Sequence, residues 1–272
     1  MTRILALARI TWLNGRRRHA VWGLFAFALA LEAAGFSFAD FFGHDLGRAA
    51  SDWVFSIMWM AGLLFTLFYA VRAVAWDENH RVIDSILAHP VSRGEYVLGM
   101  ALGLWMLALT LEAALGLVGL GVLAWMRHSI DPAYFPHFST ARFALAWLGL
   151  QAALAMMLAA LMLFSGLLRG AFPVLLSMLA WLLTGSGIPV VEQSLQRMAE
   201  RGHPAPVLQG IVHWLGAAFP NPGRLDFKDA VVSARPLPDL GLDPAWALAL
   251  ALLYAAVALA LAIALYERRD IY

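Results

Sequence analysis

Long apolar stretches dominate this chain and restrict what it can fold into. Each is long enough to cross a hydrocarbon core, which takes roughly 20 helical residues; they are 20–39, 53–71, 96–126, 143–168, 170–191 and 244–266. Barrel strands would alternate apolar and polar residues, and these stretches do not. Backbone groups in lipid must be hydrogen bonded internally, which leaves helices. We therefore predict an all-α integral membrane protein, a single domain over residues 1–272, with about six transmembrane helices.

Basic residues beside the first stretch set the expected orientation. Arg16, Arg17 and Arg18 directly precede it, and basic residues in short segments near a span end favour the cytoplasmic side. An even number of spans brings the chain back to the side on which it began. We therefore expect a multi-pass protein with both termini in the cytoplasm.

The first 15 residues predict a separate amphipathic helix. Ile4, Leu7, Ala8 and Thr11 fall on one helical face, and Arg3 lies elsewhere. Such a helix suits the cytoplasmic interface of a bilayer, where arginines lie near anionic headgroups. Residues 1–15 are therefore expected to form an interfacial helix with membrane lipid as its partner.

A long connection, residues 192–243, precedes the last apolar stretch. Apolar residues recur at helical spacing between Val207 and Leu215, which predicts a helix pair on or in the outer leaflet. Gly185, Gly187 and Pro189 come just before the connection. Glycine and proline interrupt helices, so we expect the fifth helix to end there.

The connection between the second and third stretches, residues 77–93, has a pattern of its own. It begins with Asp77 and Glu78, and Pro90 ends its helical part. One apolar face is formed by Val82, Ile83, Ile86 and Leu87. This pattern predicts an amphipathic helix between two spans. Two interpretations stay open on this pattern alone: a contact site for a cytoplasmic partner, or a surface helix that covers the span ends.

Two motifs here resemble a known family. SILAHPVSRGEYVLGM (85–100) resembles the LL-x-x-P-[VI]-S-R-x-E-x-x-x-G-K element of type-2 ABC transporter permeases, the ABC-2 family, with an acidic pair upstream as in this chain. FPNPGRLDFKDAVVSARPLP (219–238) is similar to a stretch of the branch that includes multicopper-enzyme and nitrous-oxide-reductase maturation permeases. The chain departs from the family at Arg81-Val82, where a Gly-Thr pair is common, and at Met100, where a basic residue is common.

The resemblance implies a function. The chain would be the transmembrane (permease) subunit of an ATP-driven ABC transporter, an exporter in the bacterial cytoplasmic (inner) membrane. Residues 77–93 would be the coupling helix that docks on an ATP-binding subunit. The implied ATPase-coupling residues are Asp77, Glu78, Arg81, Ile83, Asp84, Ile86, Leu87, Pro90 and Arg93.

The same resemblance implies partners. They are two copies of an ABC ATP-binding subunit and a second permease chain, identical or related. The chain lacks the GxxxxGK[ST] motif of phosphate-binding loops. ATP hydrolysis, with its ATP and Mg, is therefore expected on the partner, and no cofactor is expected in this chain, which is not itself an enzyme.

Three charged residues fall inside the expected spans: Glu32, Arg72 and Glu112. A charge at the middle of a bilayer costs about 2.5–3.5 kcal/mol on insertion scales. We therefore expect these side chains to face protein or water, along a translocation path or at a permease–permease interface.

The remaining polar residues predict no catalytic or metal site. The chain has no cysteine, and its eight histidines include no i, i+4 pair of the kind that zinc proteases need. It carries no basic stripe that would indicate a nucleic-acid partner. Two other classes of protein stay open: an intramembrane enzyme, which needs paired catalytic residues at similar depth, and a passive membrane assembly factor with no ATPase partner.

Overall fold

The computed structural model describes residues 2–36, 46–80, 91–129, 135, 138–201, 205–233 and 243–268, and these residues contain helices and no strand. The helices are α1 (Thr2–Arg16), α2 (His19–Phe36), α3 (Leu46–Leu64), the π-helical turn η3 (Phe65–Ala70), α4 (Val71–Asn79), α6 (Arg93–Ser129), α7 (Thr140–Leu167), α8 (Ala171–Glu200), α9 (Pro206–Ala218), the 3₁₀ turns η5 (Pro222–Leu225) and η6 (Lys228–Ala230), and α10 (Pro244–Arg268). The all-α prediction is confirmed for this part of the chain.

Within the described residues, five helices are long and apolar enough to cross a membrane. They are the continuous helix Leu46–Glu78, α6, α7, α8 and α10. The stretch expected as the first span forms α2, which is shorter, at 18 residues. These apolar helices indicate a multi-pass membrane protein, and a sixth crossing by α2 stays a prediction.

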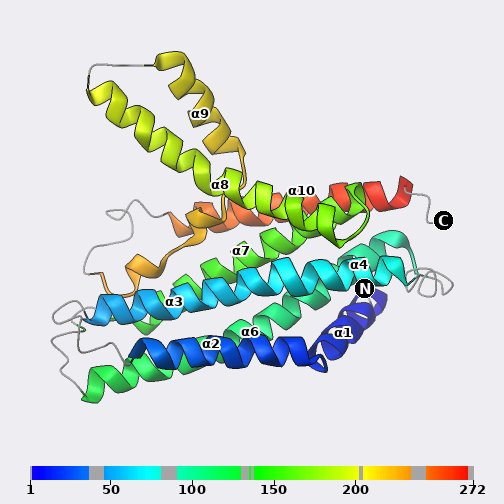
Figure 1. The fold of residues 1–272 in the computed structure, drawn as a ribbon, viewed down its shortest axis with the longest axis horizontal. Coiled ribbons are helices and arrows are strands. Elements are labelled where there is room, and N and C mark those ends of the chain that lie inside the picture. Colours follow the sequence, from blue (N-terminus) through cyan, green and yellow to red (C-terminus); the bar gives the residue numbers. More distant parts are fainter. Residues whose placement is uncertain are drawn as a thin grey trace.

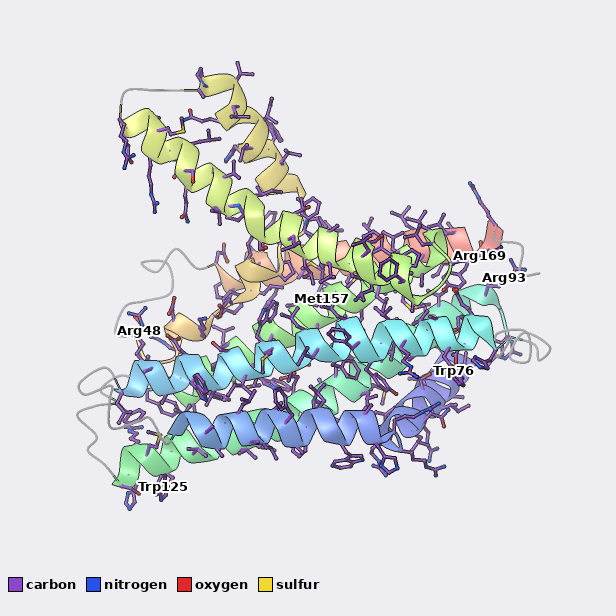
Figure 2. All side chains as sticks on the ribbon, viewed as in Figure 1. Arg48, Trp76, Arg93, Trp125, Met157 and Arg169 are labelled. Carbon is purple, nitrogen blue, oxygen red and sulfur yellow. The ribbon has the colours of Figure 1, made fainter. Side chains whose placement is uncertain are left out.

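The long helices run side by side along the longest axis of the molecule (Figure 1). The N-terminus, the end of α4 and the end of α10 lie at the same end of this bundle, here called the terminal end; the opposite end is the distal end. Arg93, Arg169 and Trp76 lie at the terminal end, and Arg48 and Trp125 lie at the distal end (Figure 2). Charged and aromatic side chains at both ends of an apolar bundle are typical of a membrane protein whose helices span the bilayer.

Helix α1 packs closely on the first turns of α6. A Cβ atom at Gly103 would lie 2.5 Å from the Cβ of Thr11 and 2.7 Å from the carbonyl oxygen of Ala8. A Cβ atom at Gly99 would lie 2.6 Å from the Cβ of Leu7. The apolar face predicted for residues 1–15 is therefore the face that meets α6, and glycine is what permits the close approach.

Helix α8 differs from the prediction for the fifth span. It was expected to end at Gly185, Gly187 and Pro189, yet it continues to Glu200 with Pro189 inside it. Proline is tolerated in membrane helices, where neighbouring groups compensate for the lost backbone bond. In Figure 1 the second half of α8 leaves the bundle, and α9 runs back beside it.

Residues 192–243 were predicted to contain a helix pair; the structure places one separate helix there, α9, which pairs with the last part of α8. The position of this pair at the outer leaflet stays a prediction. The two helices are joined by polar contacts. Nδ1 of His213 lies 3.1 Å from Oε1 of Glu192, and the Gln209 amide donates to the Leu195 carbonyl oxygen at 3.1 Å.

Candidate functional site: the tyrosine junction

The segment expected to contact a partner is attached to the bundle at two points, the end of α4 and the start of α6. Asp77 and Glu78 lie in the last turns of α4, and Arg93 is the first residue of α6. The sequence pattern predicted that Asp77 and Glu78 begin a separate coupling helix, residues 77–93. They belong instead to the long helix that began at Leu46, because polar partners at the terminal end let that helix continue past its apolar part.

The start of α6 is fixed by a capping box. The backbone N–H of Ser92 donates to Oε2 of Glu95 at 2.9 Å, and the N–H of Glu95 donates to Oγ of Ser92 at 3.1 Å. This reciprocal pair satisfies two N–H groups that a helix start otherwise leaves without partners. The Ser and Glu of the first family-like motif therefore have a structural role in this chain.

Two buried tyrosines receive the acidic residues of α4. The Tyr96 hydroxyl donates to Oδ2 of Asp77 at 3.4 Å, and the Tyr266 hydroxyl donates to Oε1 of Glu78 at 3.0 Å. The Tyr266 hydroxyl also lies 3.0 Å from Oγ of Ser165 on α7. Hydrogen bonds to a carboxylate are the stronger kind, so these contacts bind the end of α4 to α6, α7 and α10.

Arg93 completes the arrangement from the side of α6. Its guanidinium donates to the carbonyl oxygens of Tyr266 and Glu267, both at 3.0 Å. The last carbonyl groups of a helix have no partner within the helix and carry its negative dipole end, so a cation there is stabilising. We call the set Asp77, Glu78, Arg93, Tyr96, Ser165 and Tyr266 the tyrosine junction.

Glycine lets the helices of the junction approach. A Cβ atom at Gly166 would lie 3.2 Å from Leu265 and 3.3 Å from the Tyr266 ring, and one at Gly94 would lie 3.2 Å from Ile263. Both glycines therefore face the last turns of α10. Helices packed this closely move as one rigid body, because a dense protein interior is hard to compress and transmits displacement.

The junction includes three of the predicted ATPase-coupling residues and does not include the others. Asp77, Glu78 and Arg93 make contacts inside the chain, which the sequence did not suggest. Arg81, Ile83, Asp84, Ile86, Leu87 and Pro90 lie outside the described residues, so their roles stay predictions.

The two acidic residues predicted within the spans are fully enclosed. Glu112 on α6 is 0% exposed and Glu32 on α2 is 1% exposed. No carboxylate oxygen of either residue has a hydrogen-bond partner among the described residues. Both side chains face protein, as expected from the cost of charge in lipid, and they lie within the bundle of one chain. Their part in a path or an interface stays a prediction.

Arg72, the third charge, is exposed on α4 near the terminal end. It lines a cavity between α1, α4 and α6 together with Arg18. From the sequence, Arg72 was predicted to be a charge within a span, and Arg18 to be part of the basic cluster that sets the orientation. In the structure both residues line one cavity.

The second family-like motif packs against the distal end of the bundle. Leu225, Phe227 and Val231 are buried, and a Cβ atom at Gly149 on α7 would lie 2.3 Å from the Leu225 carbonyl oxygen. The Arg142 guanidinium donates to the carbonyl oxygens of Ala230 and Ser233. Residues 219–233 therefore form a fixed cover over α7 rather than a free linker.

Comparisons with known proteins leave the family open: no family model matches the chain, and no curated protein matches it. The resemblance to ABC-2 permeases therefore rests on the two motifs.

Sequence reasoning missed Tyr96, Ser165 and Tyr266. The capping box had a readable signal, because Ser92 and Glu95 fit the S-x-x-E pattern directly before an apolar run. Tyr266 had none, since its partner Glu78 is 188 positions away in the chain.

Proposed function

We propose that this chain is the permease subunit of an ATP-driven ABC transporter, working as an exporter in the bacterial inner membrane. It would cross the membrane six times, with α2 as the first span and both termini in the cytoplasm. A second permease chain, identical or related, and two copies of a separate ATP-binding subunit would complete the transporter.

The tyrosine junction is the observation that carries this proposal. Segment 81–90 connects α4 to α6 in the chain, and the described residues on both sides of it, Glu78 and Arg93, are hydrogen bonded to the last turn of α10. A force applied to that segment from outside would therefore move three helices together. Rigid elements tied in this way transmit displacement, whereas a flexible loop would dissipate it.

The position of the termini supports the orientation. The N-terminus and the end of α10 share one end of the bundle (Figure 1); Arg16 ends α1, and Arg17 and Arg18 connect it to α2. An excess of arginine near span ends favours the cytoplasmic side. The tyrosine junction is at this same end, where a cytoplasmic ATPase would reach it.

The opposite end supports a transport function in a different way. Residues 219–233 cover the distal end through buried apolar contacts and the Arg142 hydrogen bonds. A permease that alternates between two states needs a closed outer side in one of them. In the proposed transporter, the distal cover would supply this closure.

Co-purification from native membranes tests the proposal. We expect the tagged chain to retain an ATP-binding protein whose ATPase activity rises on association, and Leu87→Asp in the coupling segment to abolish that retention. Glu200→Arg, on the exposed end of α8, serves as the matched control and should retain the ATPase. A stable, active chain that never retains an ATPase would contradict the proposal and favour a passive assembly factor or an intramembrane enzyme.

A further inference from the structure

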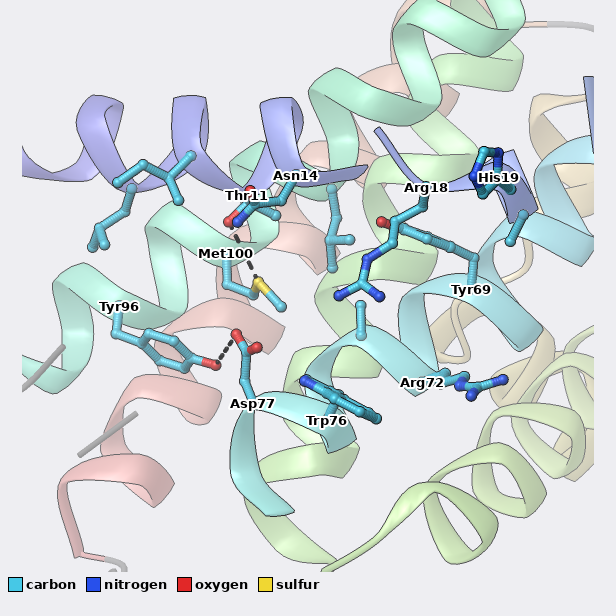
Figure 3. A pocket seen from close by; sticks show the side chains of 15 residues that line it. Thr11, Asn14, Arg18, His19, Tyr69, Arg72, Trp76, Asp77, Tyr96 and Met100 are labelled. Carbon is cyan, nitrogen blue, oxygen red and sulfur yellow. Dashed lines mark hydrogen bonds between the residues drawn. The ribbon is translucent and has the colours of Figure 1, made fainter. Parts of the chain in front are cut away.

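A cavity of about 500 Å³ opens at the terminal end between α1, α4 and α6. Leu7 and Ile10 of α1 and Leu104 of α6 form part of its apolar wall. Arg18, at the turn between α1 and α2, and Arg72 of α4 bring two cations to it. Figure 3 shows the Arg18 guanidinium pointing into the cavity and the Arg72 side chain at its edge, directed away from Arg18.

Neither arginine makes a direct ion pair or hydrogen bond within the described residues, and both are exposed. Arg18 does lie close enough to Asp77 and Tyr69 for its charge to act on them. Asp77, the acidic residue of the same cavity, is already hydrogen bonded by Tyr96 (Figure 3). The cavity therefore carries two arginine charges against one carboxylate, an excess that suits an anion.

Local helix geometry also marks this wall of the cavity. The π-helical turn η3 ends at Ala70, directly before α4, and carries Tyr69 of the lining. π-Turns inside α-helices are frequent at functional sites. Tyr69 and Trp76 add amphipathic rings of the kind found where protein meets lipid headgroups.

The volume of the cavity and its apolar wall favour an anion that carries hydrocarbon over a small free anion. A phosphate group alone would occupy a small part of a 500 Å³ cavity, and the apolar wall would have nothing to cover it. Ile10, which lines the cavity, is 54% exposed, and Leu5, also on α1, is 55% exposed. Both suit contact with acyl chains. A ligand with a phosphate at one end and hydrocarbon at the other fits both parts.

We propose that this cavity binds one anionic phospholipid, with its phosphate held by Arg18, the charge of Arg72 at the cavity edge adding attraction, and an acyl chain along Leu7, Ile10 and Leu104. The site is independent of the transport function proposed above, since it requires neither an ATPase nor a second permease chain. It differs from general attraction of basic residues to a membrane, because it holds a single lipid in a defined place.

Lipid titration of the purified chain in detergent tests the site. Binding of dioleoyl-phosphatidylglycerol and of dioleoyl-phosphatidylcholine is counted by native mass spectrometry. We expect a single strongly retained phosphatidylglycerol and no comparable phosphatidylcholine. Each arginine near headgroups is worth roughly fivefold in affinity, so Arg18→Gln combined with Arg72→Gln should weaken phosphatidylglycerol binding about thirtyfold.

Two further variants keep the test decisive. Arg16→Gln is the matched control, because Arg16 stacks over Trp12 at 5.0 Å and does not line the cavity; its binding should change less than about twofold. Ala73→Trp fills the cavity without removing a charge and should also abolish binding. The proposal would be overturned if Arg16→Gln weakened phosphatidylglycerol binding as much as the double variant does. It would also be overturned if both lipids were retained equally, or if Ala73→Trp still bound phosphatidylglycerol fully. Inorganic phosphate that displaces the lipid at equal affinity would overturn it too, and would indicate a site for a free anion.

Discussion

Replacing Tyr266 by Phe removes one hydroxyl from the centre of the tyrosine junction and little else. That hydroxyl donates to Glu78 and lies 3.0 Å from the Ser165 hydroxyl. Tyr266 is 2% exposed, so water has little access to replace it. A hydrogen bond to a charged group is worth about 1.5–3 kcal/mol and a neutral one about 0.5–1.5 kcal/mol. Together we expect a loss of about 2–4 kcal/mol of stability.

Thermal unfolding in detergent measures the loss. For a chain of this size, 1 kcal/mol corresponds to roughly 2–4 °C, so Tyr266→Phe should lower Tm by about 4–16 °C. Tyr96→Phe should lower it less, because its bond to Asp77 is longer, at 3.4 Å. Tyr69→Phe is the control: the Tyr69 hydroxyl makes no hydrogen bond to a described residue, and its loss should stay within about 0.5 kcal/mol.

A double-mutant cycle assigns the loss to the contact. Glu78→Gln and Tyr266→Phe should be non-additive by about 1–2 kcal/mol if their side chains interact as the structure shows. Additive effects, or an unchanged Tm in Tyr266→Phe, would refute the hydrogen bond and remove the physical basis of the junction.

Three substitutions test the rest of the fold. Gly103→Val should push α1 from α6 and cost about 1–3 kcal/mol, since its Cβ would meet the Ala8 carbonyl oxygen at 2.7 Å; faster proteolysis of the N-terminal helix would show it. Gly149→Val should displace residues 219–233 and speed trypsin cleavage there, whereas Gly187→Ala, with nothing within 4 Å, should not. Glu112→Leu should raise stability by about 1–3 kcal/mol, because a buried carboxyl without a hydrogen-bond partner is replaced by an apolar side chain; a higher Tm is the readout, and a lower one would mean that the carboxyl has a partner.

The all-helical architecture was predictable because lipid permits few alternatives. Runs of apolar residues and the hydrogen-bonding demand of the backbone lead directly to spanning helices. The face of α1 was also predictable from Ile4, Leu7, Ala8 and Thr11. What that face packs against was not, because nothing in the pattern distinguishes lipid from the glycine-lined surface of α6 at Gly99.

Helix boundaries were less predictable where polar residues interrupt an apolar run. Asp77 and Glu78 suggested a new element, yet tyrosines from distant parts of the chain let α4 extend through them. Pro189 suggested an end, yet α8 continues past it. In both cases tertiary contacts or the membrane environment outweigh a local signal, and a sequence shows such contacts only when their partners are near in the chain.

We propose that a separate ATPase docks on segment 81–90, and site-specific cross-linking in membranes tests this docking most directly. The chain has no cysteine, so Ser85→Cys introduces a single reactive thiol in that segment and Ser194→Cys introduces one on the exposed part of α8. We predict that Ser85→Cys cross-links to an ATP-binding protein with a yield that changes when ATP is added, and that Ser194→Cys does not. No ATP-binding adduct from Ser85→Cys, or equal adducts from both variants, would contradict the account.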